Sequence, residues 1–188
     1  MPISQISDEE LVVAIREKDR ELYSEIIHRY KTKLSHYLRK FIQDSDELED
    51  VLQDVFIKAY RNLYGFNSSK KFSPWIYRIA HNEGLNHIKK YSKFAFSLDD
   101  TEYEVIDEKM HLDAKIDSKI LKNKIAEELT KMKDKYREPI ILYFFEQKSY
   151  EEISDIMHIP ISTVGTLISR GKKNLKESLQ KLYDQRRK

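Results

Sequence analysis

Residues 149–176, SYEEISDIMHIPISTVGTLISRGKKNLK, restrict the possible fold of this chain more than any other stretch. Ser149 followed by Glu152 is a capping box, which predicts a short helix from Tyr150. A turn and a longer basic helix follow. The residues expected to close the angle between the two helices recur at helical spacing: Tyr150, Ile153, Ile156, Ile159, Val164 and Ile168. This pattern is typical of a helix-turn-helix, whose second helix enters the major groove of DNA.

The outward face of the second helix carries side chains that suit a DNA duplex. They are Ser162, Thr163, Thr166, Ser169, Arg170 and Lys173. Hydroxyl groups and lysines bind phosphate oxygens, and Arg170 has the length to reach the edge of a guanine. The alternative is that the two helices are an ordinary packed pair that contacts another protein.

The rest of the sequence predicts an all-α chain. Only four Gly and four Pro occur in 188 residues, which favours long helices over turn-rich sheets. Helix starts are predicted at the capping box Ser7–Glu10, at Asp19, at Asp44 with Glu47, and at Ser73 as N-cap before Pro74. We expect a helical domain over residues 1–91, an acidic linker over 92–118, and a second helical domain with the helix-turn-helix over 119–188.

The cellular compartment follows from what the sequence lacks. There is no Cys, which excludes disulfides and thiolate metal sites and favours a reducing compartment. The longest apolar run, 139–145, is far too short to span a bilayer. The first residues do not have the pattern of a signal peptide. We therefore expect a cytoplasmic protein without direct membrane insertion.

The net charge of +2 conceals a strong segregation of charge along the chain. Residues 44–54 contain six acids and no base, and residues 68–93 contain six bases and one acid. Residues 97–118 contain eight acids and two bases, whereas residues 165–188 contain eight bases and two acids. Such blocks indicate several partners of different charge or one large partner with several surfaces, although solvated helix faces are the simpler alternative.

The helix predicted after residue 73 has two distinct faces. Its apolar side is expected to consist of Trp75, Ile76, Ile79, Ala80 and Ile88. A second, polar side carries cations and amides at steps of three and four residues, preceded by two lysines: Lys70, Lys71, Arg78, Asn82, Asn86, Lys89 and Lys90. Cations and amides in a strip suit a single DNA strand, because cations follow phosphates while amides hold an unstacked base.

Three blocks of the sequence resemble a known family when they are taken together. They are ELEDVLQDVFIKAYRNL, FSPWIYRIAHNEGLNHIKK and KYREPIILYFFEQKSYEEISDIMHIPISTVGTLISRGKKNLKE. In this order they resemble the polymerase-binding, promoter-melting and −35-reading regions of bacterial sigma-70 factors, specifically the extracytoplasmic-function (ECF) group. The resemblance covers nearly the whole chain.

The resemblance implies a role for each set of residues. Glu49, Asp50, Gln53 and Asp54 would dock on core RNA polymerase, which agrees with the acidic run found above. The loop 65–71 and Asn82 would capture a flipped base of the −10 element, and Arg78, Asn86, Lys89 and Lys90 would hold the neighbouring strand. The last helix would read the −35 element, and the acidic linker would thread the polymerase channel. An anti-sigma factor, often membrane-anchored, is the further partner that the family implies.

The sequence departs from the family pattern at three places. His158 stands where a turn often has Gly, so some backbone strain is expected there. Gly165 and Leu167 stand where cations are frequent, so base reading is expected to differ. Gly171 lies inside the last helix and is expected to weaken it by about 1 kcal/mol relative to Ala.

Two other classes of function share features with this sequence. A stand-alone helix-turn-helix regulator would bind its operator without polymerase, but no receiver-like strand pattern accompanies the helices. An enzyme is suggested only by Glu25 and His28, an acid and a His on one helix face as in di-iron bundles, of which two pairs are needed. His28 is expected to be partly buried instead. The sequence therefore predicts no catalytic residue, no metal site and no cofactor.

Overall fold

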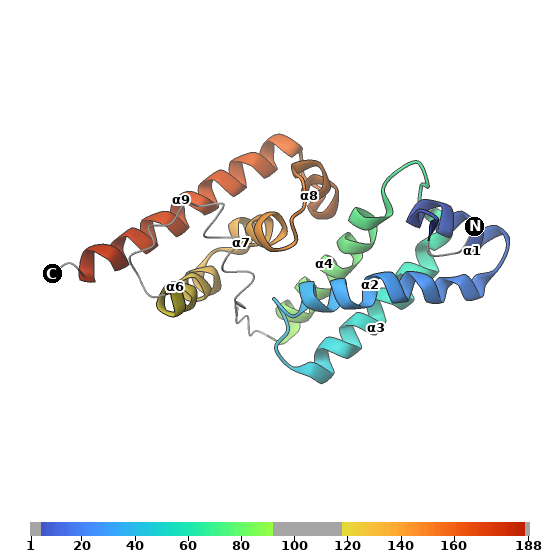
Figure 1. Ribbon diagram of the computed structural model, residues 1–188, viewed down its shortest axis with the longest axis horizontal. Helices are drawn as coiled ribbons and strands as arrows, with labels where there is room; N and C mark the ends of the chain where they lie inside the picture. Colours follow the sequence, from blue (N-terminus) through green and yellow to red (C-terminus); the bar gives the residue numbers. More distant parts are fainter. Residues whose placement is uncertain (1–4, 92–117, 187–188) are drawn as a thin grey trace. The chain divides into compact units, whose positions relative to one another are not determined.

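The computed structural model describes residues 5–91 and 118–186, and every regular element in these residues is helical. The chain divides into two compact units (Figure 1). The first contains α1 to α4 and the second contains α6 to α9. The predicted all-α class with two helical parts is therefore confirmed. The predicted acidic linker lies outside the described residues, apart from Ser118, where α6 already begins.

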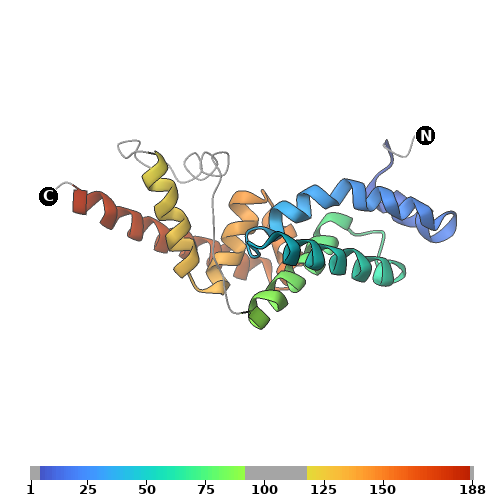
Figure 2. The ribbon, with the colours of Figure 1, turned by 90° about the horizontal axis from the view of Figure 1, so that it is seen from below.

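Over residues 5–91, the first unit is built from four α-helices and two short 3₁₀ turns. These elements are α1 (Asp8–Glu17), η2 (Arg20–Leu22), α2 (Tyr23–Leu38), α3 (Ser45–Asn62), η3 (Leu63–Gly65) and α4 (Phe72–Tyr91). α2 and α3 lie side by side, and α4 packs against both (Figure 1, Figure 2). Three predicted starts are confirmed, because the side chains of Ser7, Asp19 and Asp44 each accept a hydrogen bond from a backbone N–H of the element that follows.

The predicted start of α4 is wrong. The helix begins at Phe72 instead of after Ser73, and the backbone N–H of Phe72 donates to Oε1 of Glu9 at 2.7 Å. A carboxylate from α1 thus satisfies a backbone donor at the helix start, which lies before the serine predicted to be the cap. This contact joins residues far apart in sequence, which explains why the local pattern was misleading.

The buried side of α4 is also different from the predicted one. Ile76 and Ala80 are buried as expected, but Trp75, Ile79 and Ile88 are only half-buried. The residues that α4 buries are Phe72, Pro74, Ile76, Tyr77, Ala80, His81 and Gly84. Because α4 packs against two helices, its buried side is wider than one apolar stripe. The imidazole Nδ1 of His81 lies 2.8 Å from the hydroxyl of the fully buried Tyr37 in α2, which supplies this buried polar ring with a partner.

The second unit carries the predicted helix-turn-helix. Its elements are α6 (Ser118–Lys131), α7 (Asp134–Ile140), the π-helical turn η4 (Ile141–Phe145), α8 (Tyr150–Met157) and α9 (Ile161–Arg186). The capping box of Ser149 and Glu152 is present at the start of α8. His158 ends α8 in the left-handed conformation, with φ 56° and ψ 46°. The Ser154 hydroxyl donates to the carbonyl of Ile159 at 2.6 Å and fastens the turn.

The core of the second unit lies between α7, η4, α8 and α9. Its fully buried apolar side chains include Ile140, Phe144, Ile153, Val164 and Ile168. Tyr150, predicted to point inward with Ile153, is instead 36% exposed and packs edge-on against Tyr143 at 5.4 Å. None of the described helices combines the length and apolar character needed to cross a membrane.

Candidate nucleic-acid and protein interfaces

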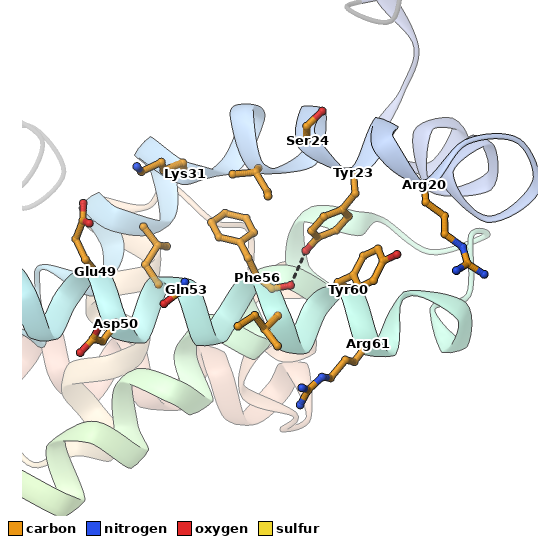
Figure 3. Close-up of a pocket in the computed structure, with 13 residues that line it drawn as sticks. Arg20, Tyr23, Ser24, Lys31, Glu49, Asp50, Gln53, Phe56, Tyr60 and Arg61 are labelled. Carbon is orange, nitrogen blue, oxygen red and sulfur yellow. Dashed lines mark hydrogen bonds between the residues drawn. The ribbon is translucent and has the colours of Figure 1, made fainter.

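The residues predicted to dock a protein partner, three acids and one glutamine, lie on the outer side of α3. Glu49, Asp50, Gln53 and Asp54 are all exposed. The first three line a groove of about 720 Å³ between α2 and α3, whereas Asp54 is not among its lining residues (Figure 3). The structure therefore brings three of the four predicted residues together in one concave surface.

The other end of this α2–α3 groove is mainly apolar and aromatic, with Arg20 and Arg61 among its lining residues. Phe56, Ile57 and Tyr60 follow Gln53 along α3, and Tyr23 faces them from α2. The Tyr23 hydroxyl donates to the carbonyl of Phe56 at 2.7 Å, and burial raises the pKa of this phenol far above its ordinary value. The rings of Tyr23 and Tyr60 meet edge to face at 4.9 Å. The hydrogen bond and ring contact fix α2 against α3 at the floor of the groove.

The apolar part of this groove was not predicted from the sequence. Ile57 is 41% exposed, Tyr60 39% and, beyond them, Tyr64 59%. Together with Gln53 they recur at steps of three and four residues, which places them on one side of a helix. That spacing was readable from the sequence, but only their exposure distinguishes them from core residues. Large exposed apolar side chains next to acids are typical of a protein-binding surface.

The polar strip predicted on α4 faces outward. Asn82, Asn86, Lys89 and Lys90 are exposed and Arg78 is half-buried. Lys70 and Lys71, in the loop before α4, are exposed as well. The acid of α4, Glu83, forms an ion pair with Lys58 of α3 at 2.5 Å. The strip consequently keeps a positive charge, as a strand of nucleic acid requires.

An aromatic cluster supports the loop that carries Lys70 and Lys71. The rings of Phe66, Phe72 and Trp75 lie 5.2 to 5.4 Å apart, so half-buried Trp75 belongs mainly to this packing. Nε of Arg16 donates to the carbonyl of Leu63 at 2.9 Å, and its Nη2 donates to the carbonyl of Phe66. α1 thus holds both ends of the η3 turn where this loop leaves α3.

The predicted DNA-reading face of α9 is exposed throughout. It consists of Ser162, Thr163, Thr166, Ser169, Arg170 and Lys173. The opposite side of the helix buries Val164, Ile168 and Leu175. The Thr166 hydroxyl donates to the carbonyl of Ser162 at 3.0 Å, which leaves its oxygen lone pairs available to an incoming donor.

The acid–histidine pair on α2 has a structural explanation. Oε1 of Glu25 accepts a hydrogen bond from Nε of Arg29 at 2.9 Å, and Arg29 also pairs with Asp8 at 2.8 Å. His28 is exposed, so the expectation that it is partly buried is wrong. Within residues 5–91 and 118–186 there is no group of three or more His, Cys, Asp or Glu side chains placed to hold a metal ion.

Comparisons with known proteins match both units in chain order. The family description "Sigma-70 region 2" matches residues 26–94, which include the α2–α3 groove and α4. "Sigma-70, region 4" matches residues 122–175, which include the helix-turn-helix. The ECF RNA polymerase sigma factor SigW of Bacillus subtilis is 34% identical, over 89% of this chain and 94% of the relative. The RNA polymerase sigma-H factor of Pseudomonas aeruginosa is 28% identical, over 96% and 97% of the two chains.

Two solved structures share the fold. CnrH, determined in complex with the cytosolic domain of CnrY, has a TM-score of 0.67 at 19% identity over 92% of this chain and 97% of its own. The sigma factor RpoE of Bartonella quintana, determined with the anti-sigma factor NepR, has a TM-score of 0.59 at 22% identity over 84% and 96%. The identity to a sigma factor over nearly its full length, with both sigma-70 regions in order, shows that this chain belongs to the ECF group of the sigma-70 family and is an alternative sigma factor of RNA polymerase.

Proposed function

We propose that this transcription-initiation factor uses three separate surfaces, one to bind core polymerase and two to bind promoter DNA. Residues 1–91 form a region 2 domain that docks on core polymerase and holds the −10 element, and residues 119–188 form a region 4 domain that reads the −35 element. Residues 92–118 connect them. One observation carries the proposal: apart from half-buried Arg78 and buried Phe66 of the loop 65–71, every side chain predicted to contact polymerase or DNA is exposed. Residues with a merely structural role would be expected to lie partly in the core.

The α2–α3 groove is the proposed docking surface for core polymerase. One end, with the acids Glu49 and Asp50, complements a basic helical partner, and the apolar end, with Ile57 and Tyr60, supplies burial. Asp54 extends the acidic surface outside the groove. Aromatic side chains at the centre of an interface usually carry much of the binding free energy, while charges at the rim steer association.

Substitutions in the groove test this docking directly. Asp50→Ala and Tyr60→Ala should each weaken binding to purified core polymerase about tenfold. Glu17→Ala is the matched control, because Glu17 is an exposed acid of α1 that does not line the groove. Affinity is measured by fluorescence anisotropy of the labelled full chain at several salt concentrations. If the double variant of Asp50 and Tyr60 binds core polymerase as tightly as the native chain, the docking surface lies elsewhere.

The α4 strip is the proposed site for the melted −10 strand. Arg78, Lys89 and Lys90 would neutralise phosphates, and the exposed amides of Asn82 and Asn86 would hold unstacked bases. Binding of the extruded bases would offset a few kcal/mol of lost stacking, so strand opening needs no covalent chemistry and we propose no enzymatic activity. Asn82→Ala should reduce open-complex formation, measured by permanganate reactivity of the melted bases, while Gln43→Ala should not. Unchanged reactivity with Asn82→Ala would refute this role.

The α9 face is the proposed reader of the −35 duplex, in combination with polymerase. When polymerase holds both domains, binding of one promoter element raises the effective concentration of the other. Two modest DNA contacts can then give tight binding together. A gel shift with and without core polymerase distinguishes this from a stand-alone regulator, which would bind tightly by itself. We expect tight promoter binding only with core polymerase. Since polymerase and chromosomal DNA share the bacterial cytoplasm, we expect the chain to act there.

We also propose control by an anti-sigma factor. The similar RpoE structure is a complex with such a protein, and the exposed apolar side chains of the α2–α3 groove offer this chain a comparable target. Isolated from its own cells, the chain should then appear in a 1:1 complex that core polymerase cannot join. Recovery of the chain only with polymerase, under conditions where its promoters are silent, would contradict this.

A further inference from the structure

The close packing of α7 against α9 brings a new set of side chains to the proposed −35 interface. A Cβ atom added to Gly171 would lie only 3.3 Å from the backbone oxygen of Tyr136. The start of α7 therefore lies directly against α9 at the position after Arg170. This crossing places Lys135 and Tyr136 of α7 beside Arg170.

Lys135, Tyr136 and Arg170 form a compact polar cluster at this crossing. Nζ of Lys135 lies 5.0 Å from the centre of the Tyr136 ring. Arg170 interacts with the Tyr136 side chain from α9. Partial desolvation raises the pKa of the Tyr136 phenol, but the charge of Lys135 and the hydrogen bond and charge of Arg170 outweigh it, so the pKa lies below its ordinary value. Two cations thus surround one hydroxyl donor.

The acid closest in sequence to this cluster is directed away from it. Oδ1 of Asp134 pairs with Nη2 of Arg137, whose side chain is buried. Arg137 is tied to the end of α6 as well, through a hydrogen bond of 3.1 Å to the carbonyl of Met132. Asp134 therefore helps to anchor α7 instead of neutralising Lys135 or Arg170. The cluster retains the positive charge that an anionic ligand needs.

The position of Arg170 around α9 decides which part of a duplex it meets. Arg170 immediately precedes Gly171, which is buried against α7. One residue corresponds to a rotation of about 100° around the helix, so Arg170 lies on the flank of α9 next to α7. Thr166 and Lys173 lie closer to the direction opposite the buried residues. A recognition helix presents that central direction to base edges and its flanks to the phosphates that line the groove.

We infer that Lys135, Tyr136 and Arg170 form a phosphate-binding site at the edge of the −35 duplex, in which Arg170 holds the DNA backbone instead of reading a guanine. The inference rests on the proposed reading of the −35 element by α9. The Tyr136 hydroxyl donates to a phosphate oxygen, and Lys135 and Arg170 balance its charge. Lys135 and Tyr136 thereby add α7 to a proposed DNA interface otherwise made of α9.

Base preference and salt dependence together test the site. The full chain bound to core polymerase selects duplexes from a library with a randomised −35 segment, and the best duplex serves as the probe for affinity. Arg170→Ala should weaken binding about tenfold and Lys135→Ala and Tyr136→Phe less, all without changing the selected sequence. Each of the two charge-removing substitutions should reduce the slope of log affinity against log salt by about 0.9.

Lys131→Ala is the matched control, because its ammonium is paired with Glu127 of its own helix. It should leave slope, affinity and sequence preference unchanged. A loss of base preference at one position with Arg170→Ala, or native salt slopes in both charge variants, overturns the phosphate site while the native chain still selects a sequence. If the native chain selects no sequence with core polymerase, the proposed −35 reading fails and the site with it. Thermal melting of each variant confirms that it is folded.

Discussion

Cγ1 of Ile140 would lie only 2.8 Å from a Cβ atom added to Gly171. Ile140 is fully buried at the end of α7, and Gly171 is buried in α9. The missing side chain therefore permits the two helices to cross closely. From sequence alone, Gly171 was expected only to weaken α9 by about 1 kcal/mol. The close crossing of α7 and α9 gives a packing reason for glycine at this position, and the cost in helix propensity stays a prediction.

Gly171→Ala should destabilise the second unit, although alanine is the better helix former. Overpacking of a tight core costs about 1–3 kcal/mol, which exceeds the gain of about 1 kcal/mol from helix propensity. Gly165→Ala is the control, because its Cβ would meet Tyr150 at an ordinary 3.5 Å and should be neutral or stabilising. The test is the melting temperature of each variant compared with that of the native chain. Equal stabilisation by the two substitutions would mean that α7 can move aside at little cost.

The sequence predicted those parts of the fold that are determined locally. The capping box at Ser149, the Asp44 cap and the helix-turn-helix all depend on neighbours within a few residues, and all are present. The failures involve contacts between distant segments. The start of α4 depends on Glu9 of α1, and the exposure of Tyr150 depends on how α8 lies against Tyr143. Local spacing does not contain this information.

The candidate surfaces also divide into parts that local sequence predicts and parts that depend on contacts between distant segments. The polar side chains of α4 and α9 could be assigned to outer faces by helical periodicity, because cations and amides seldom lie in a core. The apolar end of the α2–α3 groove could not, since Ile57 and Tyr60 look like core residues in sequence. The Lys135–Tyr136–Arg170 cluster was also out of reach, because only the packing at Gly171 brings α7 to Arg170.

The two capping boxes allow helix stability to be separated from DNA binding. Ser7→Ala and Ser149→Ala should each cost about 1 kcal/mol of the free energy of unfolding, because each leaves a backbone N–H without its partner. Only Ser149→Ala should also weaken duplex binding, since α8 positions α9. Urea unfolding measures the first effect, and anisotropy with a −35 duplex in the presence of core polymerase measures the second. An equal loss of DNA binding in Ser7→Ala would show that stability alone explains the result.

Acid should weaken the packing of α6 against α9 through Glu128. Burial raises the pKa of this carboxyl, but hydrogen bonds from Lys124 and from Ser178 of α9 outweigh it, so its folded-state pKa lies below 4.5. A depressed pKa contributes stability that is present above pH 4.5 and is lost as the pH falls through the folded value.

The melting temperature of the full chain should fall as the pH is lowered from about 6 to about 3. In Glu128→Gln this fall should be smaller than in the native chain. Glu177→Gln is the control, because its carboxylate is exposed and lies 3.8 Å from Lys173 on the same helix. Its melting curve should keep the native pH dependence. A steep acid transition that survives in Glu128→Gln would assign the effect to other carboxyls.

His158→Gly should stabilise the helix-turn-helix. His158 holds a left-handed backbone, which costs a residue with a Cβ about 1–2 kcal/mol but costs glycine little. Glycine also has more conformational entropy in the unfolded chain, which offsets part of the relieved backbone strain. We therefore expect a net gain of up to about 1 kcal/mol in the free energy of unfolding. His28→Gly is the contrasting variant, since exposed His28 lies inside α2, where glycine should cost about 0.5–1 kcal/mol. Opposite signs for the same substitution are the expected result, and destabilisation by both would show that the His158 side chain contributes contacts that exceed its backbone strain.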